Sequence, residues 1–366
     1  MIQSDVVTVE AAQAAIDAKT KPVGALGGIE TLAIRLAVLQ NTLTPSIEHA
    51  RVCVFGADHG IALEGVSAYP RSVTAEMMRT FARGRAAINV LARSGGMSVE
   101  VIDVGVDADL SELAELRHAR VRRGSRNMLN EPAMAEEEFR AALEVGRAAA
   151  KRAAHDGIHA LGLGEMGIGN TASAAAVLSG LTGLSVEQTV GRGTGVDDAG
   201  LARKQSIVER AIVRHRPAFM KGDNRIQARE VLRCLGGLEL AAIAGAAMEA
   251  AHQRIAIVAD GFISTVAVLA ALRITADSAE EQELPQLARS IFFAHSGSEL
   301  GHGASLAACA AVDGVDARPI LALALRLGEG SGAALAIPLM RAAADVMREM
   351  ATFADAGVSS ASPLAE

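Results

Sequence analysis

The stretch GIHALGLGEMGIGNTASAAAVLSGL, residues 157–181, contains a complete strand–turn–helix unit. Residues 157–165 form a short apolar run that predicts a buried β-strand. The glycine-rich turn that follows opens into an Ala- and Leu-rich segment, which predicts a helix. Strands that alternate with helices in this way form α/β folds with a parallel sheet.

Four further apolar runs end in polar or glycine-rich turns, and Ala- and Leu-rich segments lie between them. They are RVCVFGADHG (51–60), VEVIDVGVD (99–107), RIAIVADG (254–261) and SIFFAHSGS (290–298). Nearly continuous apolar strands fit a sheet that is covered on both faces. The expected fold class is therefore α/β, with a Rossmann-like parallel sheet flanked by helices.

The two ends of the chain differ from this pattern. Residues 8–40 are expected to be helical, broken at KPVGALGG, and residues from about 319 to 355 are expected to be helical, interrupted by LGEGSG. We therefore expect a small helical subdomain from residues 1–45 plus 319–366. Residues 46–318 would form the large α/β domain with the active-site cleft.

Composition limits the class of protein. The 366 residues carry a net charge of −7, which disfavours a general nucleic-acid binder. Aromatic residues make up only 2% of the chain, so aliphatic side chains must build the core. The odd set of three cysteines indicates reduced thiols, and the start MIQSDVVTVE does not resemble a signal peptide. LELAAIAGAAMEAA contains two glutamates and is typical of a buried helix rather than a membrane span. We expect a cytoplasmic protein.

Polar side chains follow the ends of the predicted strands. They are Asp58 and His59, Asp103, Glu165, Asp260 and Ser296. Open α/β sheets bind their ligands at the edge where the carboxyl ends of the strands meet, so we expect the site there.

GLGEMGIGNT, residues 162–171, contains the G-x-G-x-x-G spacing, whose amides can approach an anion at a helix N-terminus. A tight turn without a ligand is the alternative. The spacing also fits a nicotinamide-dependent oxidoreductase or a dinucleotide sensor, with Glu187 near the position of the ribose-binding acid. Glu165 argues against both, because a carboxylate repels a pyrophosphate and needs a donor such as a sugar hydroxyl.

A second glycine loop, GRGTGVDDAG (191–200), precedes Lys204, which is either a phosphate ligand or a solvated lysine. Asp197 and Asp198 resemble the acidic pair that holds ribose and magnesium in other enzymes, but they follow the glycines in the wrong order.

Two other segments leave alternatives open. In AHSGSELGH (294–302), His295, Glu299 and His302 would share a helix face as metal ligands do, but two glycines interrupt the segment. RHARVRRGSRN (117–127) is either a solvated basic loop or a contact for a substrate phosphate.

LRLGEGSGAALA (325–336) is the most informative motif. Glu329 stands between Gly328 and Gly330, after one expected apolar helix and before another. This position suits presentation of a carboxylate into a cleft, and a structural cap is the alternative. Burial there would raise the pKa of the carboxyl group toward a value suitable for a general base.

Taken together and in order, these motifs resemble the nicotinate-nucleotide–dimethylbenzimidazole phosphoribosyltransferase family, from about residue 20 to residue 359. The segments are KPVGALGGIETLA, ADHG followed by GVSAYPRSVTAEM, GEMGIGNTASAA, GRGTGVDDAGLARK, LGGLELAAIAGA, VADGFIS, AHSGSELGH and LRLGEGSGAALA. The resemblance implies transfer of ribose 5-phosphate from nicotinate mononucleotide to 5,6-dimethylbenzimidazole, in assembly of the cobalamin lower ligand. It also implies a homodimer that needs no metal or other cofactor.

The resemblance also implies roles for single residues. Glu329 occupies the place of the family's general base. The residues that match substrate-binding positions are Glu165, Gly167, Lys204, Asp260, Gly261, Phe262 and Ser296, and the base pocket is expected to include Ser67 and Tyr69. Thr80 and Ser125 stand where the family often has Asn and Thr, and the first difference concerns the shape of the base pocket.

Overall fold

The computed structural model describes residues 6–193, 195–276 and 282–359. The chain divides into two compact units, one made of Met1–Glu48 with Ile337–Glu366 and the other of His49–Ala336. In the described residues, no helix is both long enough and apolar enough to span a membrane.

The unit His49–Ala336 is built on a seven-stranded sheet in which each neighbouring pair of strands is parallel. The strand order is β3-β2-β1-β4-β5-β6-β7. The strands are β1 (Ala50–Ala57), β2 (Ser98–Gly105), β3 (Leu116–His118), β4 (Ala160–Met166), β5 (Ala256–Ala259), β6 (Ile291–His295) and β7 (Pro319–Leu321).

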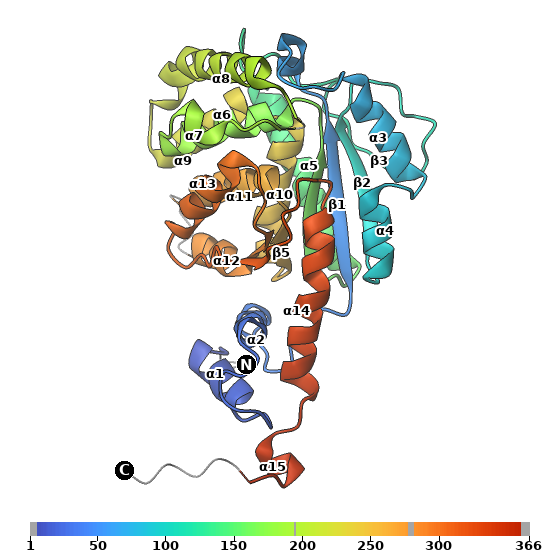
Figure 1. Ribbon diagram of the computed structural model, residues 1–366, viewed down its shortest axis with the longest axis vertical. Helices are drawn as coiled ribbons and strands as arrows, with labels where there is room; N and C mark the ends of the chain where they lie inside the picture. Colours follow the sequence, from blue (N-terminus) through green and yellow to red (C-terminus); the bar gives the residue numbers. More distant parts are fainter. Residues whose placement is uncertain (1–5, 194, 277–281, 360–366) are drawn as a thin grey trace. The chain divides into compact units, whose positions relative to one another are not determined.

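Helices precede, connect and follow the strands (Figure 1). Before β4 they are α1 (Val9–Asp17), α2 (Gly28–Gln40), the 3₁₀ helix η1 (Gly60–Glu64), α3 (Ser72–Ala82), α4 (Ala87–Ser94) and α5 (Glu136–His155). After β4 they are α6 (Asn170–Thr182), α7 (Val186–Thr189), α8 (Asp198–Phe219), α9 (Asn224–Leu235), α10 (Leu238–His252), α11 (Phe262–Thr275), α12 (Glu283–Ser290), α13 (Leu300–Ala310), α14 (Ser331–Glu349) and α15 (Phe353–Ala356).

The sheet is covered on both faces. Figure 1 shows α3 and α4 on one side of β1 and β2, and α10 and α11 on the other side. The chain runs from β1 outward to β3, then returns to β4 next to β1 and continues the other way to β7. The strand order therefore reverses between β1 and β4. In doubly wound folds, this reversal opens a crevice for ligands at the carboxyl ends of the strands.

Small residues allow the core helices to pack closely, which compensates for the scarcity of aromatic side chains. A Cβ atom on Gly146 of α5 would lie 1.7 Å from the carbonyl oxygen of Ala242 in α10. A Cβ atom on Gly245 of α10 would lie 2.1 Å from the carbonyl oxygen of Leu143 in α5. The backbones of the two helices thus touch directly, and neither glycine can be replaced without separating them.

The helical unit joins the two ends of the chain. The side chain of Lys19 donates to the carbonyl oxygen of Met350 at 2.7 Å, and Lys19 also forms an antiparallel bridge with Thr352. The guanidinium group of Arg341 donates to the carbonyl oxygen of Ile47 at 3.0 Å. The helices of this unit are α1, α2, most of α14 and α15.

The structure confirms the predicted α/β class and the five predicted strands. The short edge strands β3 and β7 were not expected. The prediction of an apolar helix before Gly328 was wrong, because β7 and an irregular segment lie there and α14 starts only at Ser331. The compact units divide at residues 48 and 336, whereas the expected boundaries at 45 and 319, as limits of independent domains, stay a prediction.

Candidate active site

A cavity of about 520 Å³ lies at the predicted edge of the sheet, within the unit His49–Ala336. Its walls come from the segments that follow β4, β5, β6 and β7, and from α3 with the loop before it. The lining residues are Tyr69, Val73, Met77, Glu165–Ile168, Asn170, Thr171, Gly193, Asp260–Ser264, His295, Gly297, Glu299, His302 and Leu325–Glu329.

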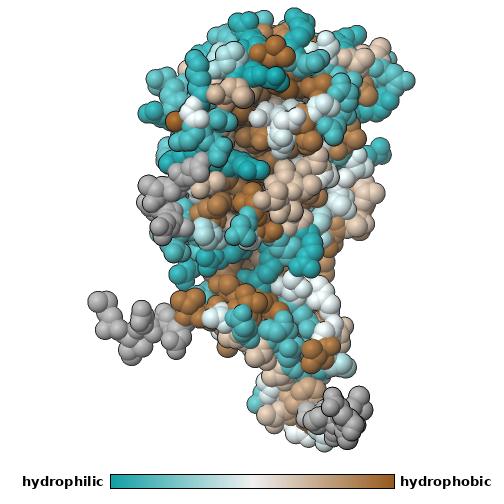
Figure 2. Space-filling view, turned by 90° about the vertical axis from the view of Figure 1, so that its left-hand side faces the viewer, coloured by the Kyte–Doolittle hydropathy of each residue, from teal (hydrophilic) through white to brown (hydrophobic). Residues whose placement is uncertain are grey.

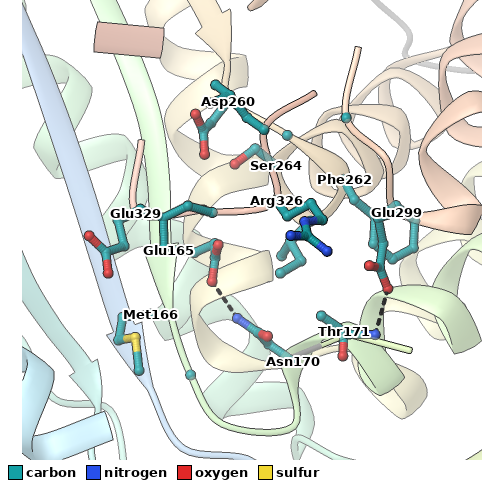
Figure 3. Close-up of a pocket in the computed structure, with 18 of the residues that line it drawn as sticks. Glu165, Met166, Asn170, Thr171, Asp260, Phe262, Ser264, Glu299, Arg326 and Glu329 are labelled. Atoms are coloured by element: carbon teal, nitrogen blue, oxygen red, sulfur yellow. Dashed lines mark hydrogen bonds between the residues drawn. The ribbon is translucent and has the colours of Figure 1, made fainter. Parts of the chain in front are cut away.

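Glu165 lies at the end of β4, against the loop that carries Glu329. Its carboxylate accepts a hydrogen bond from the side-chain amide of Asn170, at the start of α6 (Figure 3). A Cβ atom on Gly328 would lie 2.1 Å from Oε1 of Glu165, so any larger residue there would displace the Glu165 carboxylate. Burial, together with the negative charge of Asp260, raises the pKa of Glu165 to about 8. At neutral pH this side chain is therefore largely uncharged and does not repel an anionic ligand.

Glu329 is presented by a turn immediately before α14. Its φ angle is 66°, in the left-handed region that residues with a Cβ atom rarely adopt. The side chain is buried, and its Oε2 atom has no hydrogen-bond partner among the described residues. Burial raises its pKa to about 7, the charge of Asp260 adds to that rise, and the backbone N–H of Ile88 opposes it. A carboxylate with these properties can accept a proton at neutral pH.

Asp260 follows β5, and its carboxylate faces the start of α14. Oδ2 accepts from the backbone amide of Gly330 at 3.1 Å. Oδ1 accepts from the amides of Gly332 at 2.6 Å and of Ala333 at 3.1 Å. Burial raises the pKa of Asp260, and these three hydrogen bonds act in the opposite direction.

Lys204, on α8, lies behind the cavity wall rather than on it. Its ammonium group donates to Oγ1 of Thr171 at 2.8 Å and to the carbonyl oxygen of Gly191 at 3.1 Å. Glu299 accepts from the amide of Gly193 at 3.0 Å in the same loop. Burial lowers the pKa of Lys204 to about 8, so the amine is still mostly protonated at neutral pH. The two glycine loops of the sequence thus meet at this lysine.

The histidines near the cavity do not form the helix face that was considered for a metal. His295 ends β6, whereas His302 lies on α13, and their rings pack edge to face with centroids 5.6 Å apart. Nδ1 of His302 accepts from the amide of Gly297 at 2.9 Å, and burial lowers the pKa of His302 to about 4. Among the described residues, no group of three or more His, Cys, Asp and Glu side chains is arranged to hold a metal ion.

Sequence reasoning missed Arg326. It lines the cavity, and Figure 3 shows its side chain directed into the space bordered by Glu165, Asn170, Thr171 and Glu299. Arg326 stands three residues before Glu329 in the same quoted motif, but its direction depends on the loop after β7. Asn170 was also missed, although it follows the glycine-rich turn directly.

Most of the other predicted substrate-binding residues lie at the cavity. Gly167, Gly261, Phe262 and Tyr69 line it together with Glu165 and Asp260.

Ser67 and Ser296 are not among the residues that line the cavity. The hydroxyl of Ser67 accepts from the amide of Tyr69 at 3.2 Å, in the loop before α3. The amide of Ser296 donates to the carbonyl oxygen of Leu321 at 2.8 Å, which extends the pairing of β6 with β7. These contacts hold the backbone of the two segments next to the cavity.

Comparison with known proteins shows the family to which this chain belongs. A family model described as phosphoribosyltransferase matches residues 2–358. A nicotinate-nucleotide–dimethylbenzimidazole phosphoribosyltransferase of Cupriavidus taiwanensis is 47% identical over 96% of this chain and 95% of its own. The chain belongs to the nicotinate-nucleotide–dimethylbenzimidazole phosphoribosyltransferase family. The resemblance inferred from the motifs is thereby confirmed.

Other members of the phosphoribosyltransferase family agree in sequence and in fold. The enzyme of that name from Pseudomonas aeruginosa strain PAO1 is 46% identical over 94% of this chain and 92% of its own. The crystal structure of CobT from Thermus thermophilus superposes with a TM-score of 0.86 at 43% identity, covering 96% of this chain and 98% of that one. The α/β fold described above is therefore the fold of the family.

Membership in the phosphoribosyltransferase family does not favour the dinucleotide-binding alternatives. Glu187, the candidate ribose-binding acid, is exposed on α7 and does not line the cavity. The candidate magnesium pair has other partners: Asp197 accepts from the amide of Gly200 at the start of α8, and Asp198 pairs with Arg192 on the surface.

The basic cluster at residues 117–127 lies away from the cavity of this family member. None of its residues is among those that line the cavity. Four of its arginines, Arg117, Arg120, Arg122 and Arg126, pair with carboxylates instead, as Arg120 does with Asp103 at 2.9 Å. The contacts therefore favour a structural role for this cluster over one in phosphate binding.

Proposed function

We propose that this protein transfers the 5-phosphoribosyl group of nicotinate mononucleotide to 5,6-dimethylbenzimidazole, giving α-ribazole 5′-phosphate and nicotinate. This reaction builds the lower ligand of cobalamin. The names of the relatives support the proposal. The observation that carries it is the buried carboxylate of Glu329 in the wall of a cavity large enough for a nucleotide. Its pKa is raised, and its Oε2 atom has no hydrogen-bond partner in the part of the chain that the structure describes.

The reaction requires a base that accepts a proton from the benzimidazole, and it requires no acid to release nicotinate. The nicotinate ring of the mononucleotide is a pyridinium, so it leaves C1′ of the ribose as a neutral ring and needs no proton. One nitrogen of the benzimidazole forms the new bond to C1′, and the other nitrogen loses its proton. We assign that proton to Glu329, whose pKa of about 7 suits a general base.

The substrate is an anion, yet four carboxyl groups line the cavity: Glu165, Asp260, Glu299 and Glu329. Two features reduce the repulsion. Glu165 is largely protonated at neutral pH, and Asp260 and Glu299 accept hydrogen bonds from backbone amides. Arg326 and Lys204 supply positive charge, the first at the cavity surface and the second behind Thr171. We propose that both stabilise anionic groups of the mononucleotide.

Correct orientation of the bound mononucleotide would supply the rest of the rate enhancement. The N-terminus of α6 lies at the cavity through Asn170 and Thr171, and such helix ends bind phosphate. Fixing the phosphate there would hold C1′ toward Glu329 and the incoming base. We retain Gly167, Gly261, Phe262, Ser296, Ser67 and Tyr69 as proposed substrate-binding residues, with Tyr69 on the side of the base. Attack opposite to the departing nicotinate inverts the anomeric centre from β to α.

We further propose that the protein acts as a homodimer in the cytoplasm. Large hydrophobic side chains are exposed near the cavity mouth, among them Tyr69 and Leu327, and Figure 2 shows hydrophobic residues among hydrophilic ones on the viewed face. Its cysteines Cys53, Cys234 and Cys309 are free and buried, as suits a reducing compartment. Light scattering after gel filtration would test the dimer, and a monomer at micromolar concentration would contradict it.

The reaction itself is tested with purified protein after dialysis against EDTA. Nicotinate mononucleotide and 5,6-dimethylbenzimidazole are added, and chromatography with mass detection follows nicotinate and α-ribazole 5′-phosphate. We expect both products in equal amounts, and none without the benzimidazole. Equal nicotinate release without the base would indicate a hydrolase instead. Activity that returns only with added zinc or magnesium would contradict the metal-free mechanism.

A further inference from the structure

The carboxylate of Asp260 is committed to the backbone of another segment. Its two oxygens accept hydrogen bonds from the amides of Gly330, Gly332 and Ala333, at 2.6 to 3.1 Å. Asp260 follows β5, and the three amides lie some 70 residues later in the chain, at the first turn of α14. A substrate hydroxyl would therefore have to compete with three amides for these two oxygens.

The amides that Asp260 holds come directly after Glu329. The peptide N–H of Gly330 belongs to the same peptide unit as the carbonyl group of Glu329, so this hydrogen bond fixes the backbone next to the proposed base. The φ angle of 66° at Glu329 is uncommon for a residue with a Cβ atom, whereas the φ angle of 89° at Gly330 is one that glycine adopts readily. Such conformations persist where surrounding contacts hold them.

Asp260 also neutralises the positive end of α14. The first amides of a helix carry a partial positive charge, which would favour the ionised form of a nearby carboxyl group. With Asp260 on those amides, that stabilisation is offset for Glu329. The other charged or titratable groups of the cavity wall near this turn are Glu165 on β4, His295 on β6 and Arg326 on the loop before Glu329. Ile88 on α4 contributes its backbone amide. Among these groups, Asp260 is the carboxyl group that accepts hydrogen bonds from the amides directly after Glu329.

We propose that Asp260 is a positioning residue for Glu329: it holds the turn that presents the Glu329 carboxylate and keeps that carboxylate basic. This inference rests on the proposed function, and it replaces direct substrate binding as the main role of Asp260. A residue of this kind affects the chemical step and the pH dependence of turnover. It has little effect on the affinity for the mononucleotide.

The test is Asp260→Asn, which keeps the size of the side chain and one carbonyl oxygen but removes the charge and the acceptor for Gly330. We expect turnover with dimethylbenzimidazole to fall by about 10- to 100-fold, the cost of a small misplacement. We expect the acid limb of the pH profile of kcat to move down by about one unit, since a neighbouring negative charge is lost. The Kd for nicotinate mononucleotide, measured by calorimetry, should stay within about 3-fold.

Asp103→Asn is the matched control. Asp103 is also buried at the carboxyl end of a strand, where it accepts from the amide of Val106 at 2.8 Å, and it does not line the cavity. Asp103→Asn should not shift the acid limb of the pH profile of kcat, even if its melting temperature falls. A shift of the limb in both variants would mean that lost stability, rather than the position of Asp260, moves the profile.

A second measurement needs no turnover and separates this inference from the proposed function. Carbon NMR of protein labelled at glutamate Cδ, with Glu329→Gln to assign the signal, follows the titration of Glu329 directly. Its midpoint should be lower in Asp260→Asn than in the wild type. An unchanged midpoint would overturn the inference, whether or not the protein is active. A Kd weakened by 10-fold or more with an unmoved acid limb would also overturn it, because Asp260 would then be a direct ligand.

Discussion

The backbone of Glu329 lies directly against Gly164 of β4. A Cβ atom on Gly164 would stand 2.6 Å from the carbonyl carbon and oxygen of Glu329, closer than real contacts allow. Gly164 directly precedes Glu165. These two neighbouring residues of β4 both contact the loop that carries Glu329, Gly164 through its backbone and Glu165 through its side chain. The distance between the two glutamates is thus set by a glycine in the middle of a strand.

Gly164→Ala should therefore displace the turn that carries Glu329. We expect kcat to fall by about 10- to 100-fold, because small displacements of a catalytic group are costly. Stability should fall by about 1–3 kcal/mol, as is usual for overpacking. Steady-state kinetics and thermal denaturation measure the two effects.

Gly162→Ala is the control for this prediction. It lies two residues earlier on the same face of β4, and its added Cβ would meet the side chains of Ala333 and Val52 at 3.0 Å instead of a backbone. Its effect on kcat should be smaller. Equal losses in the two variants would indicate damage to the sheet rather than displacement of Glu329.

Glu329→Gln should fold and bind but react slowly. The substitution keeps the size of the side chain and removes its basicity, so kcat should fall by about 10²–10⁴-fold. In the wild type, kcat should rise with pH through about 7, because only the ionised carboxylate accepts the proton. The variant should lose this rise.

The acceptor provides the control. A 1-alkylimidazole attacks through its free nitrogen and has no proton to lose, so any reaction with it should slow far less in Glu329→Gln. Equal loss with both acceptors would show that Glu329 binds or stabilises charge instead. No loss with either would move the base elsewhere, and Glu165 would be the next carboxyl group to test.

Glu165 should make the folded protein less stable as pH rises. Its pKa is raised by burial from 4.5 to about 8, so the native state binds more protons than the unfolded state between these values. The free energy of unfolding then decreases with pH in this window, by up to about 1.4 kcal/mol per unit for one such group. Glu165→Gln should remove this contribution and gain stability relative to the wild type from pH 5 to pH 7.5.

Urea denaturation at several pH values measures this difference. Glu112→Gln is a suitable control, because Glu112 is exposed and pairs with Arg79 on the surface. A constant difference between Glu165→Gln and the wild type at all pH values would mean that Glu165 is already ionised at pH 5.

Arg326→Gln should weaken use of the anionic substrate. A charge-assisted hydrogen bond contributes about 1.5–3 kcal/mol, so kcat/KM for nicotinate mononucleotide should fall by roughly 10- to 100-fold. Nicotinamide mononucleotide keeps the phosphate but has an amide in place of the ring carboxylate, so it distinguishes between these two anionic groups as partners of Arg326. An equal loss with it would place Arg326 on the phosphate, and a much smaller loss would place it on the carboxylate. An unchanged kcat/KM with both would exclude a contact.

Lys204→Met should weaken nicotinate mononucleotide binding by about 1.5–3 kcal/mol if its charge stabilises the phosphate. The buried ammonium joins Thr171 to Gly191, so the apolar stem of Met preserves packing while removing charge and donors. Calorimetry measures the Kd. Lys151, which is exposed and distant from the cavity lining, offers Lys151→Met as the control. Unchanged affinity in Lys204→Met would remove this lysine from the phosphate site.

The α/β class and five of the strands could be predicted from the order of residues alone, because each strand is a continuous apolar run that must be buried on both faces. The same reasoning placed Glu165 and Asp260 at one edge of the sheet, since polar residues at the carboxyl ends of parallel strands meet there. Glu329 was singled out instead by its position between two glycines and by the family resemblance. The short strands β3 and β7 carry no such signal, because three residues are too few to show a period.

The chemistry of these residues, in contrast, depends on contacts made in the folded chain. The pKa values of Glu165 and Glu329 depend on burial and on Asp260, which comes from a different strand. The hydrogen bonds of Asp260 to the start of α14, the place of Lys204 behind Thr171 and the direction of Arg326 all join segments far apart in the chain. Charge and desolvation act through space, so a residue's chemistry follows from neighbours that its own stretch of sequence does not contain.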